Sequence, residues 1–189
     1  MKYYKLLVLI ILVTILTSCS GLSDVRFITP QPEFLEPLAS IPKKFQGIFL
    51  IEKDTIQVTE HTIDGNTINS DSLIVKSWGN YLFVNQMKKN YYALTCAKSV
   101  NVWNNEEINL QYFSVAEDVS RILEKSGINS EKEESEATEF LITNNLLNII
   151  GVDTSGKRDF FIIDELTTNQ FQTMLNKSVK NSVKVIRIE

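Results

Sequence analysis

His61, the only histidine in the chain, is the first candidate for acid–base chemistry. Glu60 precedes it and Asp64 follows three positions later, so a carboxylate could orient an imidazole that titrates near neutral pH. The segment leads into Asp64-Gly65-Asn66, however, and Asp-Gly is a strong signal for a tight hairpin turn. Polar side chains are expected to be exposed near such a tip. We therefore predict that His61 is a surface residue.

Cys96 is the candidate for thiol chemistry. Residues 91–96 read Tyr-Tyr-Ala-Leu-Thr-Cys, which is typical of a buried strand, and a buried cysteine behaves as a small hydrophobe. We expect Cys96 to be a core residue. A reactive thiol or an intermolecular disulfide is the alternative in an oxidising compartment.

The remaining patterns do not indicate an enzyme. The acidic run 129–139 lacks the spacing of an EF-hand loop, and a single histidine argues against a zinc site. Phosphate-binding glycine loops and the nucleophile elbow of hydrolases are missing, and Asp164 and Glu165 would point to opposite sides of an extended chain. We predict no catalytic residues, no metal ligands and no cofactor.

Residues 1–18 have the parts of a secretory signal peptide. Lys2 and Lys5 supply the positive start, and Leu6 to Leu16 form an apolar run broken only by Thr14. These eleven residues would rise about 16 Å as a helix, about half of a hydrocarbon core about 30 Å thick. We predict a cleaved leader rather than a permanent transmembrane helix.

The end of this leader, Leu16-Thr17-Ser18-Cys19, resembles the lipobox of bacterial lipoproteins. Over residues 1–19 the resemblance implies a diacylglyceryl thioether on Cys19 and a further acyl chain, such as palmitate, on its amine. Two or more chains anchor a protein stably to a membrane. Ser20 after the cysteine favours the outer membrane, with the protein facing the periplasm. The alternative is an ordinary signal peptide with a chance cysteine.

Composition limits the possible partners and the domain organisation of the chain after Cys19. Loss of Lys2 and Lys5 leaves 17 basic against 23 acidic residues, a net charge of −6, which argues against a nucleic-acid partner. All four prolines lie between Pro30 and Pro42, which predicts a semi-rigid tether over 19–42, although its aromatic residues could dock on the domain. We assign 43–189 to one domain.

That domain is predicted to be mainly β, an antiparallel meander forming a barrel or sandwich. The turns fall at about ten-residue intervals, and several segments, such as 48–51 and 160–163, are apolar on both faces and must be covered on both. The strands are expected at 45–51, 55–63, 67–78, 81–86, 91–98, 100–103, 108–113, 140–143, 146–152, 159–163 and 183–188.

Two short helices are expected at about 115–126 and 168–178. In the first, Ser114 and Glu117 fit a capping box, and Val115, Val119 and Leu123 share one face. The segment from Thr167 to Gln170 is the expected cap of the second.

These observations favour a lipid-anchored cell-envelope protein without enzymatic activity, an accessory or assembly partner of another envelope protein. The alternative is a lipocalin-like module that binds a small apolar ligand, an analogy of architecture alone, because the Gly-x-Trp signature of lipocalins is missing. An envelope hydrolase using His61 or Cys96 is a third hypothesis.

The lipobox prediction can be tested with Cys19→Ala. Without the thiol there is no acceptor for the lipid, so the variant should be left unprocessed or unanchored, as measured by electrophoretic mobility and membrane fractionation. A variant that stayed processed and membrane-bound would show that Cys19 is not the anchor.

Overall fold

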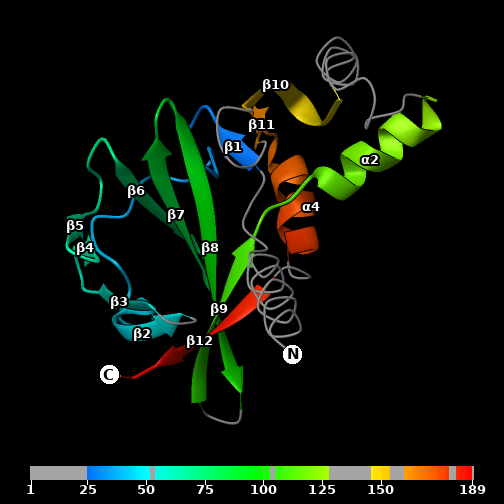
Figure 1. The fold of residues 1–189 in the computed structure, drawn as a ribbon. Coiled ribbons are helices and arrows are strands. Elements are labelled where there is room, and N and C mark those ends of the chain that lie inside the picture. Colours follow the sequence, from blue (N-terminus) through cyan, green and yellow to red (C-terminus); the bar gives the residue numbers. More distant parts are fainter. Residues whose placement is uncertain are drawn as a thin grey trace, which may run out of the picture.

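The computed structural model describes residues 25–51, 54–102, 105–127, 146–153, 160–178 and 182–188. Over these residues the chain is mainly β, with a twelve-stranded mixed sheet and two short α-helices, which confirms the predicted fold class (Figure 1). The sheet curls but does not close into a barrel. The strands are β1 (Val25–Phe27), β2 (Gly47–Ile51), β3 (Asp54–Val58), β4 (Thr62–Ile63), β5 (Asn66–Thr67), β6 (Leu73–Trp78), β7 (Tyr81–Lys88), β8 (Tyr91–Val102), β9 (Asn105–Tyr112), β10 (Ile149–Asp153), β11 (Phe160–Ile163) and β12 (Ser182–Arg187). The helical elements are α2 (Ala116–Lys125), α4 (Thr168–Ser178) and the 3₁₀ turns η1 (Lys43–Phe45) and η2 (Leu146–Asn148).

Strand β8 is the centre of the sheet. One edge pairs with β7 from Lys88↔Tyr91 to Tyr81↔Lys98, and the other edge pairs first with β1 and then with β9. The sequence predicted two strands here, at 91–98 and 100–103. The structure has one strand of twelve residues, because the ladder with β9 continues without a break from Thr95↔Tyr112 to Val102↔Asn105.

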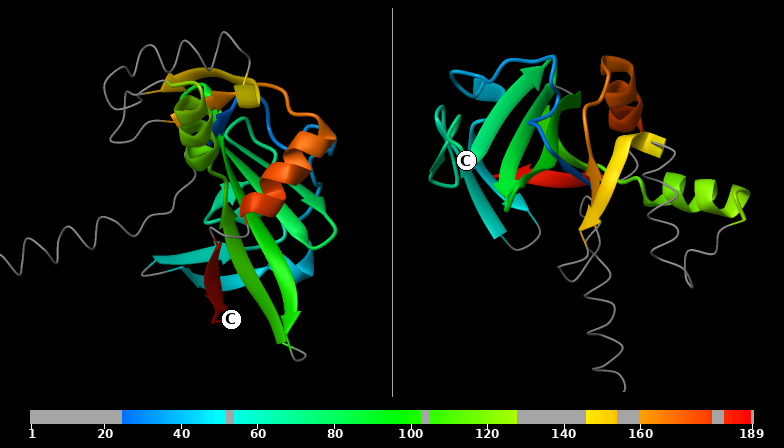
Figure 2. Two further views of the ribbon diagram at one scale, coloured as in Figure 1. Left: turned by 90° about the vertical axis from the view of Figure 1, so that its right-hand side faces the viewer. Right: turned by 90° about the horizontal axis from the view of Figure 1, so that it is seen from above.

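Both faces of the central strands are buried, as predicted for strands that are apolar on both sides. Alternate side chains, such as Phe83 and Cys96, join a core that also contains Phe171 of α4. Their neighbours Leu82 and Ala97 join a second core with β2, β6 and β12. Figures 1 and 2 show α4 on one side of β7–β9 and the β2–β3 hairpin on the other.

Local signals predicted several elements correctly. Asp64 and Gly65 form the β4–β5 turn with φ of 48° and 76°, the positive values that favour Asp-Gly there. Thr167 and Gln170 cap α4 reciprocally: the Gln170 side-chain oxygen accepts from the Thr167 backbone N–H at 2.9 Å, and the Thr167 hydroxyl accepts from the Gln170 N–H at 3.3 Å. At α2 the N-cap is Val115 rather than the predicted Ser114, so the helix begins one residue later.

Residues 25–42 belong to the domain, which corrects the predicted boundary at residue 43. β1 lies between β8 and β11, and its pairing with β11 (Val25↔Phe161) is parallel within an otherwise antiparallel arrangement. Val25 and Phe27 are completely buried in the core that faces α4. The other residues of the predicted tether, 19–24, lie outside the described part of the chain.

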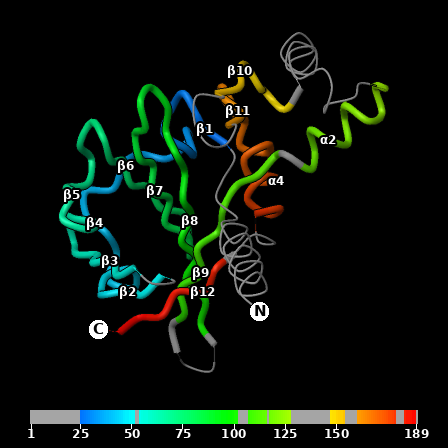
Figure 3. The backbone as a smooth tube through the Cα atoms, in the orientation of Figure 1, coloured from blue at the N-terminus to red at the C-terminus, as the bar shows by residue number. Residues whose placement is uncertain are grey.

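The proline-rich residues 28–41, which we call the strap, wrap around the edge strand β6. Figure 3 follows the backbone of the strap from β1 across β7 to β6. On the way, the buried Asn85 side chain accepts a hydrogen bond from the Gln31 N–H at 2.7 Å and donates one to the Gln31 carbonyl at 2.8 Å. Leu38 then donates its N–H to the Val75 carbonyl of β6 at 2.8 Å, and Ile41 donates to Glu60 at 2.8 Å. The strap thus covers an edge that would otherwise be open to pairing with another chain.

A buried lysine also holds the strap. The Lys76 ammonium donates to the Pro30 and Pro32 carbonyls, both at 2.9 Å. Burial lowers the pKa of Lys76, while the nearby carboxylates of Glu33 and Glu36 act in the opposite direction. The prolines restrict the conformation of the strap, but these buried polar contacts determine where it lies.

Asn85→Ala tests this anchoring. The substitution leaves the buried N–H and carbonyl of Gln31 without their partner, and each such group costs about 1–3 kcal/mol, so we expect a loss of about 2–4 kcal/mol in the free energy of unfolding. Chemical denaturation measures the change. The control Asn101→Ala lies on an exposed position of β8 and should shift the midpoint little; equal shifts in both variants would contradict the role of Asn85.

Candidate functional site

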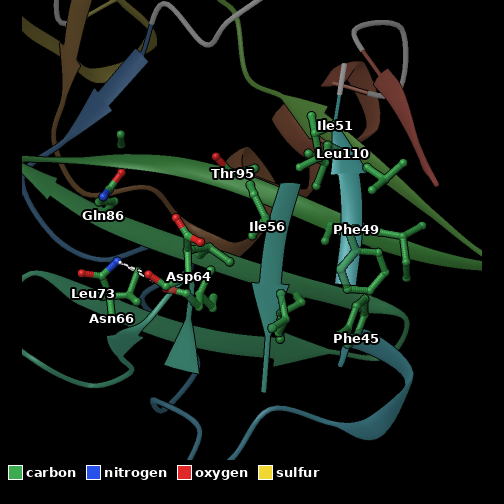
Figure 4. A pocket seen from close by; sticks show the side chains of 18 of the residues that line it. Phe45, Phe49, Ile51, Ile56, Asp64, Asn66, Leu73, Gln86, Thr95 and Leu110 are labelled. Carbon is green, nitrogen blue, oxygen red and sulfur yellow. Dashed lines mark hydrogen bonds between the residues drawn. The ribbon is translucent and has the colours of Figure 1, made fainter. Parts of the chain in front are cut away.

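A cavity of about 380 Å³ lies inside the curl of the sheet. It lies between β2–β4 and the face of β6–β9 that points away from α4, and it is partly open to solvent (Figure 4). Its volume is within the range of about 300–1,000 Å³ that is usual for small-molecule sites. The lining residues are mainly apolar: Phe45, Phe49, Ile51, Ile56, Val58, Ile63, Asp64, Asn66, Ser72, Leu73, Leu82, Val84, Gln86, Ala93, Thr95, Ala97, Ile108, Leu110 and Val185.

Small side chains on β8 make room for this cavity. Ala93, Thr95 and Ala97 occupy alternate positions of the strand and line the cavity, while Leu94 and Cys96 between them point into the core with α4. The neighbouring strands present larger residues to the same space, including Leu82 and Leu110. The larger side chains of β7 and β9 therefore fill more of the space beneath β2–β4 than the small side chains of β8 do. The cavity is the space left over β8.

An empty, dry cavity in the core would lower the free energy of unfolding. Sealed voids in a protein core cost about 24 cal/mol per Å³, but this cavity is partly open, so water can enter it. Water that enters through the opening fills the space but meets mostly apolar walls, where it finds few hydrogen-bond partners. An apolar molecule that replaced this water would gain the hydrophobic free energy of burial.

Three of the polar residues of the lining gather at one end. Asp64 and Asn66 come from the β4–β5 hairpin, and Gln86 from the part of β7 that pairs with the first residue of β6. Figure 4 shows these three side chains on one side of the cavity and Phe45, Phe49 and Ile51 on the other. The cavity thus has an apolar body and a polar end.

A second, smaller cavity of about 250 Å³ lies between α2 and α4. Asp118 and Lys177, which line it, form an ion pair at 2.6 Å between the two helices. Its walls combine this pair with Val115, Leu166 and Met174. The cavity over β8 is larger, and a greater share of its lining residues is of apolar type, so it is the better candidate for a binding site.

His61 lies where the sequence predicted, at the surface. Its side chain is 61% exposed, and its Nε2 lies 4.0 Å from a carboxylate oxygen of Glu60, which is 63% exposed. Among the described residues, the only charged partner of His61 is this solvated carboxylate, an arrangement that gives no enclosed site for proton transfer.

Cys96 is a core residue, as expected. It is completely buried on the α4 side of β8, and burial raises the pKa of its thiol far above the usual value, an effect that Lys98 opposes. A protonated thiol without access to solvent is a poor nucleophile. These observations argue against the reactive-thiol alternative.

The other residues considered from the sequence do not gather at the cavity. Cys19 and the acidic run 129–139 lie outside the described residues. Asp164 and Glu165 are exposed, and both contact Asn148 through their main chain. Phe83 and Phe113 belong to the core with α4 rather than to the cavity.

Sequence reasoning missed the lining of the cavity. Phe45, Phe49 and many aliphatic side chains form the walls, and none of these residues was singled out from the sequence as a binding residue. The usable signal was the alternation of small residues at 93, 95 and 97 within an otherwise bulky strand.

The described part of the chain contains no cluster of three or more His, Cys, Asp or Glu side chains placed to bind a metal ion. None of its helices has the length and hydropathy needed to cross a bilayer. Comparisons with protein-family models, with curated proteins and with solved structures find no match to this chain.

Proposed function

We propose that this chain is a lipid-anchored cell-envelope protein whose domain binds a small apolar ligand in the cavity over β8. The cavity carries the proposal: its volume is about 380 Å³, most of its walls are aliphatic or phenylalanine side chains, and one side is open. Burial of apolar ligand surface there contributes about 25 cal/mol per Å². The lipid on Cys19 and a periplasm-facing location at the outer membrane rest on the lipobox and on Ser20.

The short distance between Cys19 and β1 supports ligand exchange close to the membrane. Five residues, 20–24, separate the cysteine from Val25. At no more than about 3.6 Å per residue, they span about 18 Å or less when fully extended. A domain held at this distance can exchange an apolar molecule with the bilayer over a short path through water.

Thr95→Leu tests occupancy of the cavity. Thr95 is half-buried in the cavity wall, and leucine would place additional apolar volume where the ligand is expected. A steric conflict of about 1.4 kcal/mol corresponds to a tenfold loss of affinity. Protein purified from membranes with its anchor should carry a bound apolar species, detected by mass spectrometry, at much lower occupancy in the variant.

Thr55→Leu is the matched control, because Thr55 is exposed on β3 and does not line the cavity. Its occupancy should equal that of the unmodified protein. The proposal would be wrong if no species co-purified, or if both substitutions reduced occupancy equally.

A second candidate function, assembly with another envelope protein, is supported by an apolar patch on the outer face of β2 and β12. Ile186 pairs with Leu50, and the Ile188 N–H donates to the Ile48 carbonyl at 2.9 Å, so these side chains form two neighbouring cross-strand pairs. Ile186 and Ile188 are 55% and 54% exposed. Contiguous exposed apolar residues of this kind mark interaction surfaces.

Ile186→Lys tests the patch. The isoleucine is exposed, so a lysine should leave the fold intact but place a charge within the proposed contact. Gentle crosslinking of the anchored protein should recover one stoichiometric envelope protein with the unmodified chain and lose it with Ile186→Lys. The control Ile150→Lys makes the same change at an exposed position of β10 and should retain capture. Recovery of only free monomer from the unmodified chain would contradict this function.

A further inference from the structure

The polar end of the cavity indicates what kind of ligand fits. One end carries the amides of Asn66 and Gln86 and the carboxylate of Asp64, and the remainder of the lining is mostly apolar. Asp64, Asn66 and Gln86 are exposed, so the polar end lies at the solvent-facing side of the cavity. An amphiphile could place its chain against the apolar walls and its head group at this exposed end. The cavity volume, near the lower limit for small-molecule sites, suits an amphiphile with a single chain.

The charge of the cavity lining limits which head groups such an amphiphile can have. Asp64 is the only charged residue among the described residues of the lining, which include no lysine, arginine or histidine. Its main chain forms two hydrogen bonds: the N–H donates to Gln57 at 2.7 Å, and the carbonyl accepts from the Asn66 side chain at 3.2 Å. Within the described part of the chain, the Asp64 carboxylate has no cationic partner.

Arg187 lies near the opposite end of the cavity. Its guanidinium lies over the Phe49 ring, 5.3 Å from the ring centroid, and donates to the main-chain oxygen of Lys44. Figure 4 shows Phe49 on the far side of the cavity from Asp64. Arg187 therefore does not neutralise an anion at the polar end.

We infer that the ligand is a single-chain amphiphile whose head group donates hydrogen bonds and carries no negative charge, such as an alcohol or an ammonium. This inference rests on the proposed function of the cavity. The Asp64 carboxylate accepts a hydrogen bond from the head group, and the amides of Asn66 and Gln86 complete the polar end. A carboxylate or phosphate head would face Asp64 without a compensating cation, so the site selects against it by charge repulsion.

The test uses the full chain in membrane vesicles prepared from the cells that produce it. Three photoreactive alkyl probes share one chain and end in a hydroxyl, an ammonium or a carboxylate. Labelling is mapped by mass spectrometry to peptides of β7 and β8. We expect the ammonium probe to label these peptides about tenfold more than the carboxylate probe, the effect of one charged hydrogen bond of about 1.4 kcal/mol.

Asp64→Asn isolates the charge. Asparagine tolerates the positive φ of 48° at this position and keeps the shape of the side chain. In the variant, the ratio of ammonium to carboxylate labelling should fall towards one. Asp54→Asn, at an exposed position of β3 outside the lining, makes the same change in net charge and should keep the original ratio. This comparison cancels any difference in how the probes partition into the vesicles.

The outcomes separate the two proposals. If no probe labels β7 and β8 above the level seen with Thr95→Leu, the cavity does not bind apolar ligands and the proposed function fails. If all three probes label equally, if the carboxylate probe labels most, or if Asp64→Asn leaves the ratio unchanged, the cavity binds ligands but the inferred head-group selectivity is wrong.

Discussion

The burial of β8 on both faces is the constraint on which the rest of the structure depends. Its ladder with β7 holds one edge, and β1 and β9 share the other. On one face, Leu94 and Cys96 require the cover that α4 provides. On the other, Ala93, Thr95 and Ala97 are too small to fill the space beneath β2–β4. The same strand therefore forms a dense core on one side and leaves a cavity on the other.

The strap covers the edge strand β6 of this sheet. Prolines remove donors and limit the conformations of the strap, but they do not place it. Placement comes from buried polar contacts, chiefly those of Asn85 and Lys76 with the main chain of the strap. These contacts are specific because each would leave an unsatisfied buried group if broken. Residues 25–42, which the sequence assigned to a tether, are for this reason part of the domain.

In the proposed protein, the anchor and the cavity have separate roles. The lipid on Cys19 would keep the domain within a short distance of the bilayer, and the cavity would hold an apolar molecule away from water. In this proposal Asp64, the one carboxylate among the described residues of the lining, would add selectivity among head groups rather than affinity for the chain. The outer apolar patch of β2 and β12 lies on the opposite face of those strands, so ligand and partner would not compete for the same surface.

The sequence by itself determined the features that depend on neighbouring residues. The Asp64-Gly65 turn, both helices, the cap at Thr167 and the mainly β class follow from local conformational preference and from the period of apolar residues. Only the tertiary structure decided the parallel pairing of Val25 with Phe161, the docking of the strap and the cavity. Each of these depends on which distant surfaces meet. A cavity, in particular, is a mismatch between side-chain volumes on separate strands, and no local pattern contains the distance between them.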